Sequence, residues 1–255
     1  MTNRDDDLIE DRFDQSSQYD REWMIANSMG PNAIWLAEFL GGAMSLQPGM
    51  KVLDLGCGKA MSSIFLAQTY GVEVWACDLW IAAEENRARV DQAGLGEQIH
   101  TVNSEAHVLP FEPQTFDAIV SIDAYHYFGT DDLYLGYLLE FLKPGGQIGI
   151  VSPGLVEEFS HDPPEHLQVG WCSEFASFHS SDWWRRHWER SGKVDVLTAD
   201  LLADGWRLWL HWNEVCAETQ DYVSASENEM LSADAGRNLG FVRLVAERRE
   251  EGRWL

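Results

Sequence analysis

Two aspartates and two glycines stand at a spacing that could bind a nucleoside-containing cofactor. The stretch VLDLGCGKA, residues 52–60, places Gly56 and Gly58 directly after an apolar run that carries Asp54. Asp78 closes the next apolar run. A glycine turn between a strand and a helix lets a ligand approach the backbone, and an acid about twenty residues further on can accept hydrogen bonds from ribose hydroxyls. The pattern therefore predicts a ligand that contains a ribose.

The residues around the turn distinguish among such ligands. A nucleoside triphosphate loop is disfavoured because Lys59 is followed by Ala60 and the required upstream glycine is absent. The dinucleotide fingerprint needs a small residue at the position of Met61, so NAD remains only an alternative. Asp54 could face a cationic group, which a phosphate site would avoid and a sulfonium amino acid would favour. S-adenosylmethionine meets these demands.

Composition limits the fold and the partners. The chain has 255 residues, 45% of them hydrophobic, which favours one α/β domain with a substantial core. Its formal net charge of -24 would repel nucleic acid and anionic membrane surfaces, so we expect neither as a partner. Four cysteines without a C-x-x-C pair indicate a reducing compartment. Because no signal peptide or apolar membrane span is recognisable, we expect a cytoplasmic protein.

Apolar runs typical of strands alternate with helical patterns along the chain. Strands are predicted at 51–57, 72–79, 99–105, 116–125, 147–154, 193–202 and 239–249, and helices at 62–71, 82–96, 131–146, 180–192 and 204–220, after two short helices around Gly30–Pro31. This order predicts a Rossmann-like, doubly wound α/β fold with a mostly parallel seven-stranded sheet, an N-terminal helical lid and a helical insertion before the last strand. We expect a single domain over 1–255: a lid (1–48), a cofactor-binding core (49–155) and substrate-side helices with the last two strands (156–255).

Four segments in succession resemble the motifs of class I S-adenosylmethionine-dependent methyltransferases, notably the small-molecule subgroup. They are VLDLGCGKA, VWACDLW, NSEAHVLPFEPQTFDAIVSIDAYHYF and LKPGGQIGIV, and the resemblance spans about residues 51–151. It implies a set of cofactor-binding residues: Tyr19, Asp54, Gly56, Gly58, Asp78, Leu79, Trp80, Glu105, Ala106, Ile122 and Asp123.

The resemblance also assigns places within that set. Asp54 would support the amino group of the methionine part, and Asp78 would bind the ribose. Glu105 would lie near the adenine amino group, where the family has an aspartate. Tyr19 lies in the segment that folds over the cofactor in similar enzymes; a helix-surface aromatic is the alternative.

The residues after the fourth predicted strand are the catalytic candidates. The resemblance places His126 opposite the reacting methyl group, with Tyr125 beside it. An imidazole there could accept a proton from the acceptor because its ordinary pKa lies near neutrality. The alternative is that His126 packs beneath the following loop or hydrogen-bonds the cofactor.

The tryptophans and the loop histidines could form a cation-π box or a metal site. Trp184 and Trp188, and the triad Trp206, Trp209 and Trp212, recur at helical spacing, which favours core packing over a cation-π box. The segment SHDPPEHL, residues 160–167, lacks the helical geometry of a zinc site, so no metal is predicted.

The sequence thus favours a monomeric or homodimeric methyltransferase that acts on a small molecule, with in-line attack on the sulfonium methyl group. An amine nitrogen is the favoured acceptor, and oxygen or carbon acceptors remain open. The alternatives are a non-catalytic S-adenosylmethionine-binding module, a nicotinamide-dependent oxidoreductase, and a cyclopropane-forming enzyme, against which the acidic surface argues.

Overall fold

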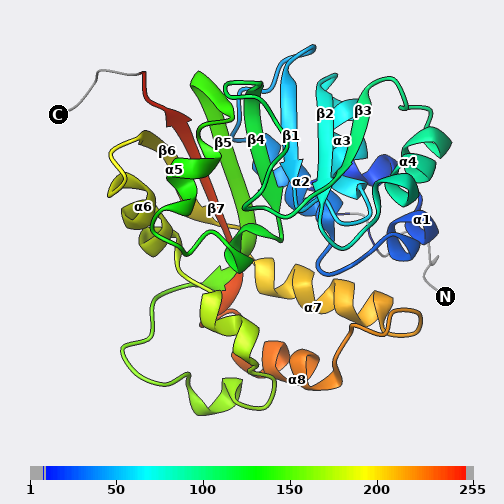
Figure 1. The fold of residues 1–255 in the computed structure, drawn as a ribbon. Coiled ribbons are helices and arrows are strands. Elements are labelled where there is room, and N and C mark those ends of the chain that lie inside the picture. Colours follow the sequence, from blue (N-terminus) through cyan, green and yellow to red (C-terminus); the bar gives the residue numbers. More distant parts are fainter. Residues whose placement is uncertain (1–7, 9, 251–255) are drawn as a thin grey trace.

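A seven-stranded sheet forms the centre of the molecule (Figure 1). The computed structural model describes residue 8 and residues 10–250. In spatial order the strands are β3 (Ile99–Asn103), β2 (Glu73–Asp78), β1 (Lys51–Leu55), β4 (Phe116–Ile122), β5 (Leu142–Leu155), β7 (Leu239–Arg248) and β6 (Val194–Leu201). The neighbours from β3 to β5 pair in parallel, while β7 pairs antiparallel with both β5 and β6. The predicted fold class is confirmed.

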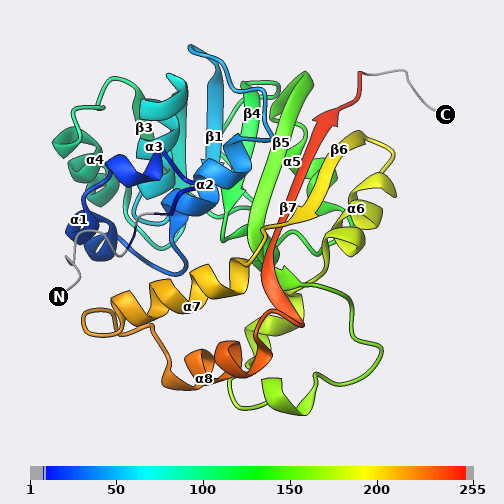
Figure 2. The same cartoon turned by 180° about the vertical axis from the view of Figure 1, so that it is seen from behind.

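Helices cover both faces of the sheet (Figure 2). The α-helices of the described residues are α1 (Arg21–Ala26), α2 (Ala33–Gly41), α3 (Met61–Tyr70), α4 (Ala83–Gln92), α5 (Tyr134–Leu138), α6 (Ser181–Glu189), α7 (Gly205–Cys216) and α8 (Ala225–Asp234). Alternate residues of β1 enter two separate hydrophobic clusters: Val52 packs with α2 and α3, whereas Leu53 packs with α5 and α6. This alternation is expected for a buried strand, because successive side chains point to opposite faces.

One predicted helix is much shorter in the structure. The prediction extended it over residues 131–146, but α5 ends at Leu138 and β5 already begins at Leu142, which pairs with Phe116. Pro144 cannot continue a helix and Gly145 has a φ of 75°. The KPGG segment is therefore an irregularity within β5, where the pairing register shifts.

Helix α8 is not predicted by the sequence pattern. Its segment ASENEMLSAD buries only Met230, Leu231 and Asp234, so it lacks a helical apolar stripe. The helix packs against α7 and the 3₁₀ turn Glu165–Leu167 (η4), contacts that local sequence does not reveal. Figure 1 shows α7 and α8 together beyond one end of the sheet.

Most of the tryptophans that recur at helical spacing are core residues, as expected. Trp184, Trp188 and Trp212 are fully buried and Trp209 is nearly so. Among the residues that the structure describes, no helix has the length and apolarity needed to cross a membrane.

Candidate active site

A cavity of about 310 Å³ opens where β1, β2 and β4 end. Its wall combines the turn after β1, the ends of β2 and β4, and the loop that joins α1 to α2. Residues from the sequence-predicted set that line it are Gly56, Gly58, Asp78, Leu79, Trp80, Glu105, Ala106, Ile122 and Asp123. The carboxyl edge of a parallel sheet is the usual ligand site of such folds.

The glycine turn is shaped by close contacts. Gly56 has a φ of 77°, and a Cβ at this position would lie 2.3 Å from the Cβ of Ala124. Gly58 has a φ of 53°, and its Cβ would lie 3.1 Å from Sδ of Met29. Left-handed backbone and missing side chains are both glycine properties, so the two residues keep the turn open to the cavity.

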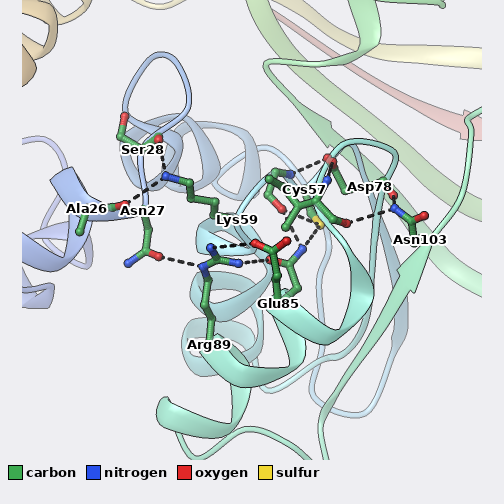
Figure 3. Close-up of polar contacts among 12 residues, drawn as sticks. Ala26, Asn27, Ser28, Cys57, Lys59, Asp78, Glu85, Arg89 and Asn103 are labelled. Atoms are coloured by element: carbon green, nitrogen blue, oxygen red, sulfur yellow. Dashed lines mark hydrogen bonds and ion pairs between the residues drawn. The ribbon is translucent and has the colours of Figure 1, made fainter. Parts of the chain in front are cut away.

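Asp78 organises the neighbouring backbone. One carboxylate oxygen accepts the Gly58 N–H at 2.8 Å, and the other accepts the N–H groups of Trp80 at 2.8 Å and Ile81 at 3.0 Å. Figure 3 shows Asp78 and Asn103 side by side, and the Asn103 amide donates to the Asp78 carbonyl at 3.0 Å. A carboxylate offers about four acceptor positions, so Asp78 retains capacity for a ribose hydroxyl.

Asp54 lies beneath the cavity and does not line it. Its Oδ2 accepts hydrogen bonds of 2.6 Å from the hydroxyls of both Ser62 and Ser63, and its Oδ1 has no partner. Burial raises the pKa of Asp54 to about 6, against the opposing effect of the two serines. Ser62 does line the cavity, so it stands between this carboxylate and a bound ligand.

An apolar rim borders the side of the cavity that the resemblance assigns to adenine. Leu79 is 53% exposed and Trp80 is 70% exposed. The ring of Trp80 contacts that of Tyr127 edge-on, with 6.0 Å between the ring centroids. The carboxylate of Glu105 meets Nδ1 of His107 at 2.9 Å. Large apolar side chains left exposed at a cavity mouth are typical of a binding site.

The end of β4 supplies an unusual acid. Asp123 has a φ of 56°, and its backbone N–H donates to the Val151 carbonyl at 2.8 Å. Burial raises the pKa of its carboxyl to about 8, and the nearby Glu227 carboxylate adds to this shift.

Besides Asp54, three predicted site residues do not line the cavity: His126, Tyr125 and Tyr19. His126 is buried against Phe178 and Tyr127, its Nδ1 has no partner, and burial lowers its pKa to about 4. Tyr125 is fully buried among aromatic rings, including those of Trp184 and Trp188. The position of His126 corresponds to the packing alternative.

Tyr19 lies at a separate hollow, away from the cavity. Its hydroxyl donates to Gln68 at 2.8 Å, and its ring packs on Trp23 and Phe65. Tyr19 therefore does not cover the cavity, because its ring and hydroxyl contact Phe65 and Gln68 of α3 instead.

The lid contacts come instead from residues 27–31, which sequence reasoning did not select. Nζ of Lys59 donates to the carbonyls of Ala26 at 3.1 Å and Ser28 at 3.3 Å, and Arg89 donates to Asn27 at 3.2 Å (Figure 3). These bonds tie the loop before α2 to the glycine turn and to α4. The Gly30–Pro31 break was the one available signal for this loop.

Comparison with known proteins identifies the domain. Residues 52–146 match the family model described as a methyltransferase domain. This match supports the predicted class I S-adenosylmethionine-dependent methyltransferase domain over this part of the chain. The match decides between the methyltransferase and nicotinamide interpretations that the glycine turn left open.

Relatives of the methyltransferase domain act on different acceptor atoms. A sterol 24-C-methyltransferase of Yarrowia lipolytica is 27% identical over 138 residues, covering 51% of this chain and 35% of the relative. An erythromycin 3''-O-methyltransferase of Saccharopolyspora erythraea is 32% identical over 141 residues, covering 52% of this chain and 44% of the relative. The chain thus spans less than half the length of these curated relatives.

Solved structures share the fold. Phosphoethanolamine N-methyltransferase 2 of Haemonchus contortus, in complex with S-adenosylmethionine, superposes with a TM-score of 0.67 at 16% identity, covering 98% of this chain and 61% of that chain.

The methyltransferase cavity fits S-adenosylmethionine, the methyl donor of the family. The Gly56–Gly58 turn is a cradle that a Cβ would fill, Asp78 has one spare acceptor position, and the carboxylate of Asp54 is buried beneath Ser62. A ribose hydroxyl would use the spare position of Asp78, and a cationic amino acid part would be attracted by Asp54 through Ser62.

Proposed function

We propose that this protein transfers the methyl group of S-adenosylmethionine to a small-molecule acceptor, with an amine nitrogen as the favoured atom. The observation that carries the proposal is the cavity itself. It joins the glycine turn and Asp78 on one side to Asp123 on the other, so a cofactor and an acceptor would meet at the end of β4.

Individual residues would divide the binding work. Asp78 would hold the ribose, while the rim formed by Leu79 and Trp80 would cover the adenine. Asp54, acting through Ser62, would favour the positive charge of the cofactor's amino acid part. Bound there, S-adenosylmethionine supplies an electrophilic methyl group on a sulfonium.

Positioning would supply most of the rate enhancement, because methyl transfer needs the acceptor in line with the breaking bond. The loop of residues 27–31 would exclude water from the reacting centre, since Lys59 ties it to the glycine turn. His126 lies outside the cavity within the η3 turn, Tyr125–Tyr127, so its role would be to pack against Phe178 and Tyr127.

Acidity and aromatic rings support an amine acceptor. The chain has a formal net charge of -24, and the rings of Trp80 and Tyr127 stand at the cavity wall beside Asp123. Carboxylates and aromatic faces both attract cations. We further propose the three-part organisation of 1–48, 49–155 and 156–255, because Gly30 of the first part borders the core's cavity and Trp212 of the last part hydrogen-bonds the Gly30 carbonyl.

The test measures release of S-adenosylhomocysteine from S-adenosylmethionine with separate pools of amines, phenols, thiols and carboxylic acids. Release with the amine pool supports the proposal, whereas release with another pool alone reassigns the acceptor atom. Tryptophan fluorescence measures cofactor binding in parallel, because Trp80 lies at the cavity. Binding without release from any pool would favour the non-catalytic module, and absence of binding would contradict the proposal.

A further inference from the structure

The acceptor side of the cavity contains a carboxylate without a partner. Asp123 lines the cavity, and no hydrogen bond or ion pair reaches its side chain from any residue in the described part of the chain. Its backbone lies in the left-handed region, with a φ of 56°. A non-glycine residue tolerates this conformation at some cost, and such costs concentrate at functional sites.

The lid loop closes over this carboxylate. A Cβ on Gly30 would lie 2.5 Å from Oδ2 of Asp123, so the loop approaches because residue 30 has no side chain. The Gly30 carbonyl in turn accepts the indole N–H of Trp212 at 2.9 Å. Helix α7 therefore fixes the loop over Asp123, which is half-buried at the cavity wall.

A second carboxylate is fixed beside the first by α7 and α8. Oε1 of Glu227 accepts hydrogen bonds from Nε1 of Trp209 at 3.0 Å and from Nδ2 of Asn213 at 2.7 Å. These two donors hold the Glu227 carboxylate in place near enough to act on the charge of Asp123. Glu227 itself does not line the cavity.

The groups that raise the pKa of Asp123 and of Tyr127 carry no positive charge, and the ammonium of Lys59, which also lines the cavity, donates to the carbonyls of Ala26 and Ser28. Tyr127 from η3 is influenced by Asp123, Glu227, and two residues near the 3₁₀ turn Ser173–Ser177 (η5), Glu174 and Cys172. No lysine or arginine contributes to the raised pKa values of Asp123, Tyr127 and Glu227. Two half-buried carboxylates without a cationic partner raise the free energy of the folded protein when both are ionised. Either a proton or a cationic ligand removes this penalty.

We propose that Asp123 and Glu227 together select an acceptor that carries an ammonium group, and that Asp123 removes the ammonium proton before methyl transfer. This inference rests on the proposed function. The Asp123 carboxylate takes one proton from the ammonium, which becomes an amine with a free electron pair. That pair forms the bond to the methyl carbon as the carbon–sulfur bond breaks, and its electrons remain on the neutral thioether. Asp123 then releases the proton to solvent.

In this arrangement Asp123 is the catalytic residue and Glu227 is a positioning residue that acts through it. Protonated Asp123 is inactive as a base, so kcat/KM should rise with pH near the raised pKa of this carboxyl, about 8. Removing the charge of Glu227 should move that rise to lower pH, because one like charge no longer opposes ionisation of Asp123.

The experiment compares wild type with Asp123→Asn and Glu227→Gln, and with Glu229→Gln as a control on the exposed side of α8. The probes are 2-phenylethylamine, ethanolamine and glycine, each paired with its hydroxy analogue: 2-phenylethanol, ethylene glycol and glycolate. The readouts are S-adenosylmethionine affinity by calorimetry, binding of each probe to the protein saturated with S-adenosylhomocysteine, and the pH profile of methyl transfer.

We expect at least one amine to bind and react while its hydroxy analogue does neither. Asp123→Asn should lower kcat/KM by roughly 100-fold or more. Glu227→Gln should raise KM for the amine about tenfold and shift the rising limb down by roughly half to one pH unit. Glu229→Gln should match wild type, and both Glu227→Gln and Glu229→Gln should bind S-adenosylmethionine normally.

Three results would overturn the inference: no binding of any amine, preference for the hydroxy analogues, or an unchanged pH profile in Glu227→Gln. If a hydroxy analogue or another acceptor is methylated while the amines are inert, methyl transfer stands and only the amine site fails. Absence of S-adenosylmethionine binding in wild type would instead contradict the proposed function.

Discussion

The backbone N–H of Gly58 donates a hydrogen bond of 2.8 Å to the carboxylate of Asp78. The acid that ends β2 therefore fixes the glycine turn that follows β1, in addition to any role toward a ribose. Two motifs twenty residues apart act as one structural unit because β1 and β2 are parallel neighbours whose carboxyl ends meet. Changes to either motif should therefore affect both the turn and the cofactor.

Asp78→Asn should weaken S-adenosylmethionine binding by about 100-fold, as expected when a buried charged acceptor is lost. An asparagine can offer its single oxygen either to the Gly58 N–H or to the N–H groups of Trp80 and Ile81, because its amide nitrogen is a donor. Calorimetric titration with the cofactor measures the effect. Glu73→Gln, at the opposite end of the same strand, is the matched control and should bind normally. Equal affinity of Asp78→Asn and wild type would remove Asp78 from the site.

Gly56→Ala should abolish measurable cofactor binding and lower the free energy of unfolding by about 1–3 kcal/mol. The new Cβ would meet Ala124 at 2.3 Å and would also occupy a left-handed backbone position. Gly94→Ala separates these effects, because Gly94 has a φ of 72° but nothing within 4 Å of its Cβ position. Urea unfolding and cofactor titration of both variants test the expectation. A similar loss of binding in Gly94→Ala would show that close packing at Gly56 is irrelevant.

Asp54 should make both stability and cofactor binding depend on pH. Its folded-state pKa of about 6 lies above its ordinary value of 3.8, so the folded state retains the proton to higher pH. Its contribution to stability is therefore full below about pH 4 and decreases by about 3 kcal/mol as pH rises to about 6. Because a cationic cofactor favours the ionised form, its affinity should rise over the same interval. Urea unfolding and calorimetry between pH 4 and 7 measure both trends, and Asp54→Asn should remove them.

His126→Leu should leave kcat within about threefold of wild type, whereas loss of a general base typically costs 10²–10⁴-fold. The side chain lies outside the cavity, and burial lowers its pKa to about 4, so it is neutral at pH 7. Its stabilising contribution as a neutral group should be complete above pH 6.5 and be lost as pH falls toward 4. Steady-state kinetics with the acceptor found in the pooled assay provides the measurement. A loss of 100-fold or more in a folded variant would restore His126 as the base.

Local pattern was sufficient for most of the core. Strand-like runs such as KVLDL, followed by a glycine turn and an acid at the end of the next strand, predicted the parallel sheet and most of the cavity wall. These features are local because a glycine's backbone freedom and a strand's apolar character depend on neighbours in the chain. The same reasoning failed at α8, where burial against α7 stabilises a segment whose own pattern is weak.

By itself, the sequence determined the fold class, the methyltransferase motifs and most of the residues from Gly56 to Asp123 that line the cavity. Only the tertiary structure decided which candidates reach the cavity: His126 and Tyr125 are adjacent in sequence to lining residues, yet both are buried outside it. It also brought Glu227 to Asp123 across more than a hundred residues. The physical reason is that side-chain direction and long-range proximity result from packing among elements, which no local pattern of residue types encodes.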